Sequence, residues 1–256
     1  MANLTKDKIV YSLQVAGVKP GDILLVHSSL SSIGHVEGGA GAVVDALIEA
    51  VGPEGTIAVS TLSLSHPFDP ETTKSTVGLI SETLRNRPNA IRSLHPMHSI
   101  AASGARAEEL CRDHDKAATG CGFGTPYLKL RDMGGKILLL GVDMNRNTTL
   151  HAIEDLMDSH YLETLVAEAP TYMDAETITI TKFPPGHRDF LKFTPHLRRA
   201  GALLHGKIGN AVFQLIDVRK MFGLGLKLVA DDPMFFMCEN EACEYCSDAY
   251  KALKGE

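Results

Sequence analysis

A histidine and a glutamate stand three residues apart in the stretch 147–155, which follows an apolar run. If this stretch forms a helix, His151 and Glu154 lie on one helical face, because residues i and i+3 are neighbours there. An imidazole titrates near neutral pH and can take a proton from an attacking group, while a carboxylate beside it stabilises the charged ring. The pair therefore predicts general-base chemistry. A core histidine with a solvated glutamate is the alternative interpretation of the same spacing.

The neighbouring residues predict how this pair is positioned. The run 136–142 is continuously apolar, which is typical of a strand buried on both faces. Thr148 or Thr149 is expected to cap the helix that follows. In open α/β sheets ligands bind outside the carboxyl ends of the strands, so His151 and Glu154 are expected to face such a crevice.

A second histidine ends another predicted strand, 23–26, and a run of hydroxyl side chains follows it. His27 and Ser28 come first, and Ser29, Leu30 and two further serines continue the segment. Hydroxyl and backbone N–H groups at a strand end can face the carbonyl oxygen of a substrate. The alternative is a serine-rich turn that satisfies its own backbone.

These two segments and a third, 92–99, resemble the signature blocks of the aminoglycoside 3-N-acetyltransferase family, also called the antibiotic N-acetyltransferases. The third block has the sequence Arg-Ser-Leu-His-Pro-Met-His-Ser. Further similar segments follow in the family's order and spacing, at 21–22, 38–40, 68–70, 78–81, 122–126 and 139–142. The resemblance extends over residues 5–230 and depends on the three blocks together.

This resemblance implies transfer of an acetyl group from acetyl-CoA to an amino group of a polycationic aminoglycoside antibiotic, namely the 3-amino group of its deoxystreptamine ring. It also implies a catalytic histidine at His151 with an acidic partner at Glu154, and it places the block with His27 and Ser28 beside the coenzyme. Acetyl transfer needs a neutral amine and donors for the oxyanion, and it requires no metal. We therefore expect His151 to act as the base and Ser28 to bind the thioester carbonyl. Glu154 either orients His151 or holds the substrate ammonium.

The other candidate site residues are assigned to the two substrates. Arginine and backbone amides suit phosphate groups, and carboxylates suit a cationic acceptor. The expected coenzyme-binding residues are Ser28, Ser29, Leu30, Arg92, His95, Ser99, Thr148 and Thr149. The expected partners of the acceptor are Asp69, Asp143, Glu154 and Asp155. A nucleophilic serine is a rival mechanism, but Ser28 lacks the Gly-x-Ser-x-Gly context of the hydrolases.

Three cysteines near the carboxyl end, Cys238, Cys243 and Cys246, form a C-x4-C-x2-C arrangement outside the family blocks. Such a cluster can hold a soft metal if a fourth ligand comes from elsewhere, a Cys-x-x-Cys pair can be redox-active, and buried cysteines also serve as small hydrophobic residues. Two alternative functions therefore stay open. One is acetylation of a different small-molecule amine, and the other is metal or redox binding on a degenerate acetyltransferase fold.

Composition limits the class of protein. The 256 residues carry a formal net charge of −6, and 44% of them are hydrophobic, which is typical of a soluble globular protein. The negative charge argues against a nucleic-acid surface, and no apolar run approaches the roughly 20 residues that span a bilayer. The amino terminus lacks a signal-peptide pattern, which predicts a cytoplasmic protein whose five cysteines are thiols. A homo-oligomer is compatible with the sequence.

The order of the predicted elements defines the expected fold class. A strand–helix–strand unit over 23–60 favours parallel pairing, so we expect an α/β protein with a mostly parallel central sheet flanked by helices. Alternation at 177–181 predicts an antiparallel strand with one wet face. We expect a single domain over 1–256, with an antiparallel extension or small lobe at about 165–215 and a helical pattern from 212 to 228.

Overall fold

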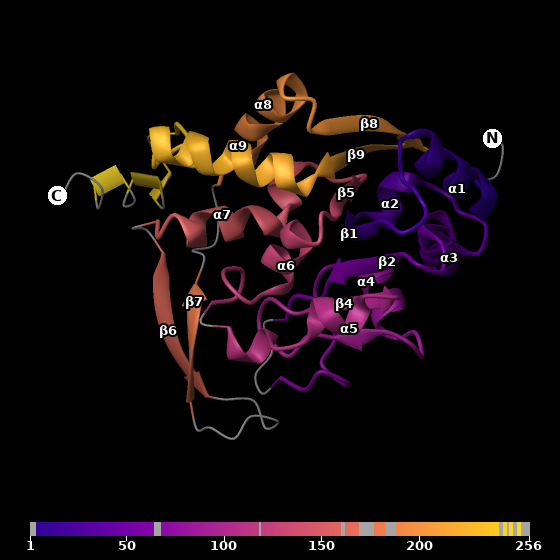
Figure 1. The fold of residues 1–256 in the computed structure, drawn as a ribbon, viewed down its shortest axis with the longest axis horizontal. Coiled ribbons are helices and arrows are strands. Elements are labelled where there is room, and N and C mark those ends of the chain that lie inside the picture. The colour runs from indigo at the N-terminus through magenta and orange to yellow at the C-terminus, as the bar shows by residue number, and fades with distance from the viewer. Residues whose placement is uncertain are drawn as a thin grey trace.

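The computed structural model describes residues 4–63, 68–117, 119–159, 162–168, 177–182, 188–240, 243–244, 246–247 and 250–251. Its centre is a seven-stranded sheet with the order β3-β4-β2-β1-β5-β9-β8, and β6 and β7 form a separate two-stranded sheet (Figure 1). The strands are β1 (Ile23–Ser28), β2 (Thr56–Ser60), β3 (Ile91–Arg92), β4 (Ile100–Gly104), β5 (Lys136–Leu140), β6 (Glu163–Glu168), β7 (Thr177–Lys182), β8 (Leu203–Ile208) and β9 (Ala211–Asp217). The helices are α1 (Lys6–Val15), α2 (Leu30–Ile33), α3 (Gly39–Val51), α4 (Leu79–Arg85), α5 (Ala107–Cys111), α6 (Pro126–Asp132), α7 (His151–Leu156), α8 (Phe193–Arg199) and α9 (Val218–Asp231). Short 3₁₀ turns lie at His114–Lys116, Met144–Arg146, Thr148–Leu150 and Phe190–Lys192.

Strand β1 lies in the middle of the sheet and pairs in parallel with β2 on one side and β5 on the other. Its apolar residues are buried on both faces, as the continuous hydrophobic run predicts. Leu25 stands opposite Ala58 of β2 and Ile137 of β5. The carboxyl ends of these three strands therefore meet at one edge, where His27 and Ser28 end β1.

The α/β class is confirmed, but the sheet is mixed rather than mostly parallel. The pairs β2–β4, β3–β4, β5–β9 and β8–β9 are all antiparallel. Strands β8 and β9 are joined only by Gly209 and Asn210, and Gly209 has a φ of 59°. Such a short hairpin allows only antiparallel pairing, whereas a parallel partner needs a long crossover. The strand–helix–strand unit therefore predicts the pairing of β1 with β2 and not that of the outer strands.

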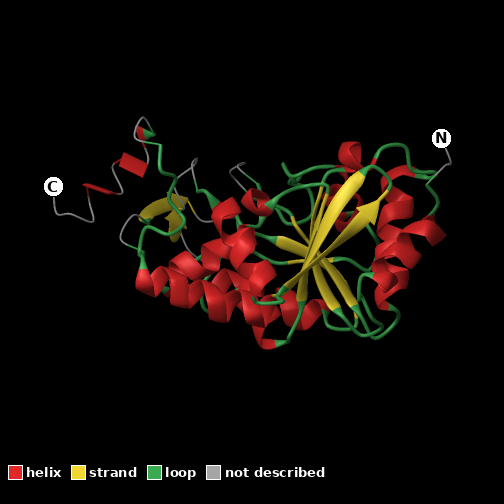
Figure 2. Cartoon of the chain, turned by 90° about the horizontal axis from the view of Figure 1, so that it is seen from above, coloured by secondary structure: helices red, strands yellow, loops and turns green. Residues whose placement is uncertain are grey.

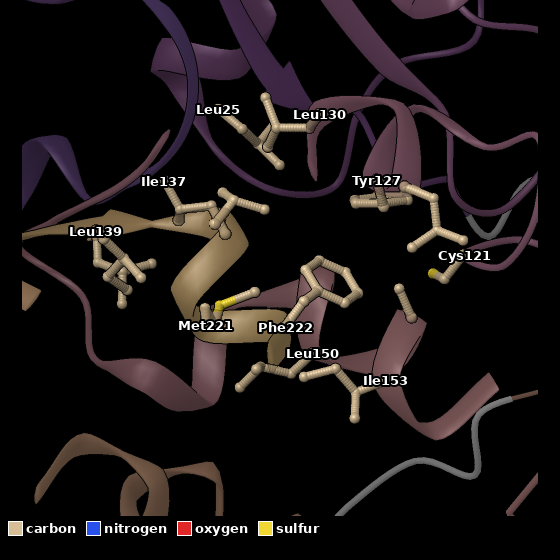
Figure 3. Packing of buried hydrophobic residues seen from close by; sticks show 14 of the residues in the cluster. Leu25, Cys121, Tyr127, Leu130, Ile137, Leu139, Leu150, Ile153, Met221 and Phe222 are labelled. Atoms are coloured by element: carbon tan, nitrogen blue, oxygen red, sulfur yellow. The ribbon is translucent and has the colours of Figure 1, made fainter. Parts of the chain in front are cut away.

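Helices cover both faces of the sheet (Figure 2). Side chains alternate along β1, so Leu24 and Val26 pack with α1, α3 and α4, whereas Leu25 faces the helices on the other side. Figure 3 shows this second layer, in which Leu25 shares a core cluster with Ile153 of α7 and Phe222 of α9. The packing fixes α7 against the sheet. Among the helices of the described residues, none has the length and apolar character needed to cross a membrane.

The carboxyl-terminal half divides its antiparallel strands between two sheets. The strand predicted at 177–181 is confirmed as β7, which pairs with β6 in the sheet that stands apart in Figure 1. The extension expected at about 165–215 is not one unit, because β8 and β9 join the central sheet next to β5. The helical pattern predicted from 212 is wrong as far as 217, since these residues belong to β9, and α9 begins only at Val218.

Phe222 of α9 is 1% exposed, and its position in the core predicts a large loss of stability when the side chain is truncated. We expect Phe222→Ala to lower the free energy of unfolding by about 3–5 kcal/mol, because the removed ring leaves a cavity that its neighbours cannot fully close. Urea unfolding followed by circular dichroism measures the change. The matched control is Tyr11→Ala in α1, at a residue that is 69% exposed, where we expect a change within about 0.5 kcal/mol. Equal losses in the two variants would contradict this packing.

Candidate active site

The segment between β5 and α7 makes two 3₁₀ turns before the helix begins at His151. Asn147 is fully buried, and its side-chain oxygen accepts a hydrogen bond from Thr149 N at 3.3 Å. The expectation that Thr148 or Thr149 caps the helix is therefore wrong, since the capping side chain at the second turn is that of Asn147. An amide oxygen is an equally good acceptor for a helical N–H group. This cap fixes the path along which the chain enters α7.

Three side chains form a hydrogen-bonded chain from the pocket wall into the protein. His151 Nδ1 lies 2.6 Å from Glu154 Oε2, and Arg188 Nε donates to Glu154 Oε1 at 2.6 Å. The Glu154 side chain is fully buried, whereas 21% of the His151 side chain is exposed. The His151 ring also meets the Phe190 ring edge-on, with centroids 5.4 Å apart. The imidazole is thus held from two directions and still reaches solvent.

The environment of Glu154 decides the tautomer of His151. Burial raises the pKa of the Glu154 carboxyl, but His151 and Arg188 lower this pKa by more, so that it lies below its ordinary value. An ionised carboxylate only accepts hydrogen bonds, and His151 Nδ1 must therefore donate in their contact. The lone pair of the neutral ring is then on Nε2. A general base needs such a lone pair to take a proton.

A pocket of about 410 Å³ opens at the carboxyl ends of the three central strands. Its lining includes His27 and Ser28 of β1, Ser60 of β2 and His151 of α7. The other walls come from the loop after β2, from α4 and from the turns after β5. These residues are Leu62, Thr76, Val77, Ser81, Val142, Asn145, Arg146 and Thr148. The structure thus brings His151, His27, Ser28 and Thr148 together around one cavity.

The residues at the end of β1 have different environments. Burial lowers the pKa of His27 to about 4, so that its ring is neutral at neutral pH. Ser28 is half-buried on the pocket wall. Ser29 Oγ accepts hydrogen bonds from Ser32 N at 3.4 Å and from Ser32 Oγ at 2.9 Å, and so caps its own short helix. Leu30 packs against the core cluster of α1 and α3.

The arginine of the third sequence block is used inside the protein. Arg92 donates to the carbonyl oxygens of Thr61 and Thr73 and to Ser99 Oγ. Ser99 is fully buried and donates to Thr61 O at 2.8 Å. These bonds fasten the loop after β2, which supplies one wall of the pocket, to the sheet. Neither Arg92 nor Ser99 is among the residues that line the pocket.

His95 belongs to a buried cluster of three histidines with His98 and His114. Its ring stacks on that of His114 with centroids 4.7 Å apart, and its Nδ1 accepts from His98 N at 2.9 Å. His114 contacts Ser93 Oγ at 2.8 Å and Gly120 O at 3.0 Å. Burial lowers the pKa of all three rings, to about 3 for His98 and His114. A neutral stack of this kind supports the fold and offers no cation to a phosphate.

The acidic residues expected to bind a cationic acceptor are dispersed. Asp69 accepts hydrogen bonds from two backbone N–H groups of its own loop. Asp143 caps the turn after β5 and lines a second hollow of about 430 Å³, which shares Val142 with the pocket. Asp155 is half-buried, and burial raises its pKa. Glu154 uses both of its oxygens within the protein.

Two arginines at this site carry no local sequence signal. Arg188 lies 34 residues after Glu154 and shares no periodic pattern with it. The signal that would point to it is physical, because a buried carboxylate requires a positively charged partner. The sequence does not show, however, that Glu154 is buried. Arg146 lines the pocket from the turn after β5, where a polar residue is ordinary.

Comparisons with known proteins identify the family of this chain. The family model for aminoglycoside 3-N-acetyltransferase matches residues 25–230. Aminoglycoside N(3)-acetyltransferase IV from a Salmonella species is 30% identical over 244 residues, which cover 91% of this chain and 90% of that relative. This chain belongs to the aminoglycoside 3-N-acetyltransferase family, and it is an acyltransferase.

Solved structures of similar proteins have the same fold. The crystal structure of a histidine-to-alanine mutant of the aminoglycoside acetyltransferase AAC(3)-IVa, in complex with a gentamicin, matches with a TM-score of 0.90 at 30% identity and covers 98% of each chain. The binary complex of AAC-IIIb with CoASH matches with a TM-score of 0.82 at 27% identity, covering 90% of this chain and 97% of the other. The chain therefore aligns with these enzymes over nearly its whole length.

The buried ion pair predicts a large stability loss when Arg188 is replaced by methionine. Arg188→Met removes the guanidinium that compensates the buried Glu154 carboxylate, and breaking a buried pair in this way costs about 3–5 kcal/mol. Urea unfolding near neutral pH measures the loss. The control is Arg106→Met, since Arg106 forms a surface pair with Glu109 in which the two side chains are 42% and 44% exposed, and such pairs contribute little. An Arg188→Met protein as stable as this control would contradict the role of the pair.

The three-histidine cluster predicts a loss of stability in mild acid. His95, His98 and His114 have lowered pKa values in the folded state, whereas the unfolded chain regains values near 6.5. Below that pH the unfolded state binds more protons, so the free energy of unfolding falls as the pH falls, by at most about 1.4 kcal/mol per pH unit for each ring. Urea unfolding between about pH 7.5 and about pH 5.5 measures how the free energy of unfolding changes with pH. His98→Gln should make this dependence weaker. The control is His205→Gln, at an exposed position, which should leave the dependence unchanged. A stability independent of pH in this window would rule out the prediction.

Proposed function

We propose that this protein acetylates an amino group of an aminoglycoside with acetyl-CoA as the donor, in a direct transfer for which His151 is the general base. The observation that carries the proposal is the chain of His151, Glu154 and Arg188 at the wall of the pocket. Membership of the aminoglycoside 3-N-acetyltransferase family supports the acceptor class and its 3-amino group. The AAC(3)-IVa complex with a gentamicin supports an acceptor of the same kind.

The geometry supports a general-base mechanism that uses His151, Glu154 and Arg188. His151 Nε2 takes the proton that the amine loses as it attacks the thioester carbonyl. A C–N bond forms, the C–S bond breaks, and the imidazolium returns its proton to the leaving thiolate. Glu154 stabilises the imidazolium in the meantime, because its carboxylate stays ionised and accepts a hydrogen bond from Nδ1–H. Arg188 keeps Glu154 ionised and in place.

We propose that the thioester carbonyl of acetyl-CoA binds beside the carboxyl end of β1. Ser28 lines the same pocket as His151, and a hydroxyl donor there would stabilise the developing oxyanion. His27 lies beside it on the wall and is neutral at neutral pH. It therefore adds no positive charge that would raise the cost of forming the imidazolium at His151.

We assign the coenzyme to the polar wall formed by the turns after β5. Asn145, Arg146 and Thr148 present an amide, a cation and a hydroxyl to the pocket. These groups suit phosphate oxygens and the amides of a pantetheine chain. The structural similarity to AAC-IIIb with bound CoASH supports a coenzyme of this class. In this assignment Arg146, rather than Arg92, is the cation of the coenzyme site.

Glu154 orients His151 in this proposal and does not hold the acceptor. Its full burial and its two short hydrogen bonds keep the carboxylate inside the protein. The ammonium groups of the acceptor then need carboxylates nearer to solvent. Asp69, Asp143 and Asp155 are the proposed partners, and each is at least partly exposed.

Thiol release from acetyl-CoA by the purified protein, measured against a panel of aminoglycosides and simple amines, tests the reaction and the acceptor together. Release that depends on an aminoglycoside supports both. Release with other amines alone would overturn the acceptor class and assign the same chemistry to a different small molecule. Release without any acceptor would indicate a hydrolase, and absence of coenzyme binding would reject the donor.

The general-base role predicts a specific loss of turnover on replacing His151. We expect His151→Ala to lower kcat by about 10² to 10⁴, because the amine then loses its proton without a positioned acceptor. Steady-state kinetics measure the change, and circular dichroism checks that the variant is folded. The matched control is His205→Ala, at an exposed position on β8 outside the pocket lining. A folded His151→Ala protein with normal turnover would remove the assignment.

A further inference from the structure

The carboxyl-terminal segment brings three thiols to one point. The Sγ atoms of Cys238, Cys243 and Cys246 all lie within 4.8 Å of one another, and the first and last are 3.2 Å apart. The described residues include all five cysteines, and none of these forms a disulfide. The C-x4-C-x2-C spacing therefore closes into a compact set of sulfurs in the fold.

Packing alone does not account for this cluster. Cys121 illustrates a cysteine used as a small hydrophobic residue, because it is fully buried among aliphatic and aromatic side chains of the large core (Figure 3). Cys243 and Cys246 are buried as well, at 5% and 1% exposure. Cys238, however, is only half-buried, and its Sγ atom nevertheless lies within 4.8 Å of the Sγ atoms of the other two cysteines. The common feature of the three residues is the point on which their sulfurs converge.

Three cysteine sulfurs around one point are the ligand set of a soft divalent cation. Zinc binds cysteine sulfur at about 2.3 Å in tetrahedral sites, which places the sulfurs roughly 3.8 Å from one another. The Cys238–Cys246 separation of 3.2 Å is shorter than this value and no separation exceeds 4.8 Å, so small side-chain rotations are enough to form the site. The neighbours are the apolar residues Met234, Met237 and Leu162, together with Tyr250. In such surroundings three thiolates need a cation to balance their charge.

We propose that Cys238, Cys243 and Cys246 supply three ligands of a structural zinc-type site, whose fourth position is filled by a donor outside these three residues. Thiolate ligands select zinc over the hard cations, which prefer oxygen. The site would stabilise a segment that has a small core of its own. It is separate from the acetyl-transfer chemistry, which uses none of these cysteines.

The position of the cluster gives this site a structural consequence. Met237, which directly precedes Cys238, pairs with Arg188 in an antiparallel β-bridge. The adjacent residues continue the contact, because Asp189 N donates to Phe236 O at 2.7 Å. Metal binding would therefore fasten the carboxyl-terminal segment against the residues that carry Arg188 to Glu154.

Metal analysis of the full-length protein tests the proposal. After expression with zinc and removal of loosely bound metal, we expect about one zinc ion per chain. Cys243→Ala should lose nearly all of it, whereas Cys121→Ala, the matched change at a buried cysteine of the core, should retain it. Addition of a strong chelator should lower the Tm of the wild-type protein and leave the Tm of Cys243→Ala unchanged, because a ligand that binds only the folded state stabilises it.

Two further measurements cover the case in which Cys243→Ala fails to fold. Cys238→Ala changes the half-buried ligand and should also lose the zinc. Cobalt added to metal-free wild-type protein should give the thiolate-to-metal charge-transfer absorption of a cysteine-coordinated ion. The proposal would be overturned if the wild-type protein held no zinc and showed no such absorption. It would also be overturned if Cys238→Ala retained the zinc, or if protein purified without reductant contained a Cys238–Cys246 disulfide. None of these readouts depends on acetyl transfer, so they are independent of the proposed function.

Discussion

The carboxylate of Glu154 is a fully buried charge, and the arrangement of the site follows from the need to compensate it. An unpaired charge in the interior costs several kcal/mol, so its two oxygens are occupied by His151 on one side and Arg188 on the other. The first contact sets the tautomer of the imidazole. The second joins α7 to a segment that follows the β6–β7 pair. The orientation of the His151 imidazole therefore depends on a contact between two distant parts of the chain.

The sheet supplies the frame in which this contact is possible. Strands β1, β2 and β5 run in parallel, so their carboxyl ends meet and leave a pocket outside the sheet. The antiparallel strands on either side widen the sheet, and none of their residues lines the pocket. On one face α7 and α9 pack into the core, which holds His151 at the pocket although the turns before it are short.

The sequence block at 92–99 lies outside the lining of the pocket. The block contributes Arg92, whose hydrogen bonds fasten the loop after β2, and two members of the buried cluster of three histidines, His95 and His98. The hydrogen bonds of Arg92 hold the loop that supplies one wall of the pocket. The cysteine cluster has a comparable position relative to Arg188, because its segment pairs with the backbone of that residue. Residues that do not line the pocket thus help to determine where its lining residues lie.

The sequence by itself determined the features that depend on neighbours along the chain. The buried strands at 23–26 and 136–140, and the placement of His151 and Glu154 on one helical face, follow from local periodicity. Only the tertiary structure decided the antiparallel edges of the sheet, the partnership of Glu154 with Arg188, the internal use of Arg92 and the convergence of three cysteine sulfurs. These features depend on where the chain returns in space and on which polar groups are removed from water, and neither is encoded in the spacing of adjacent residues.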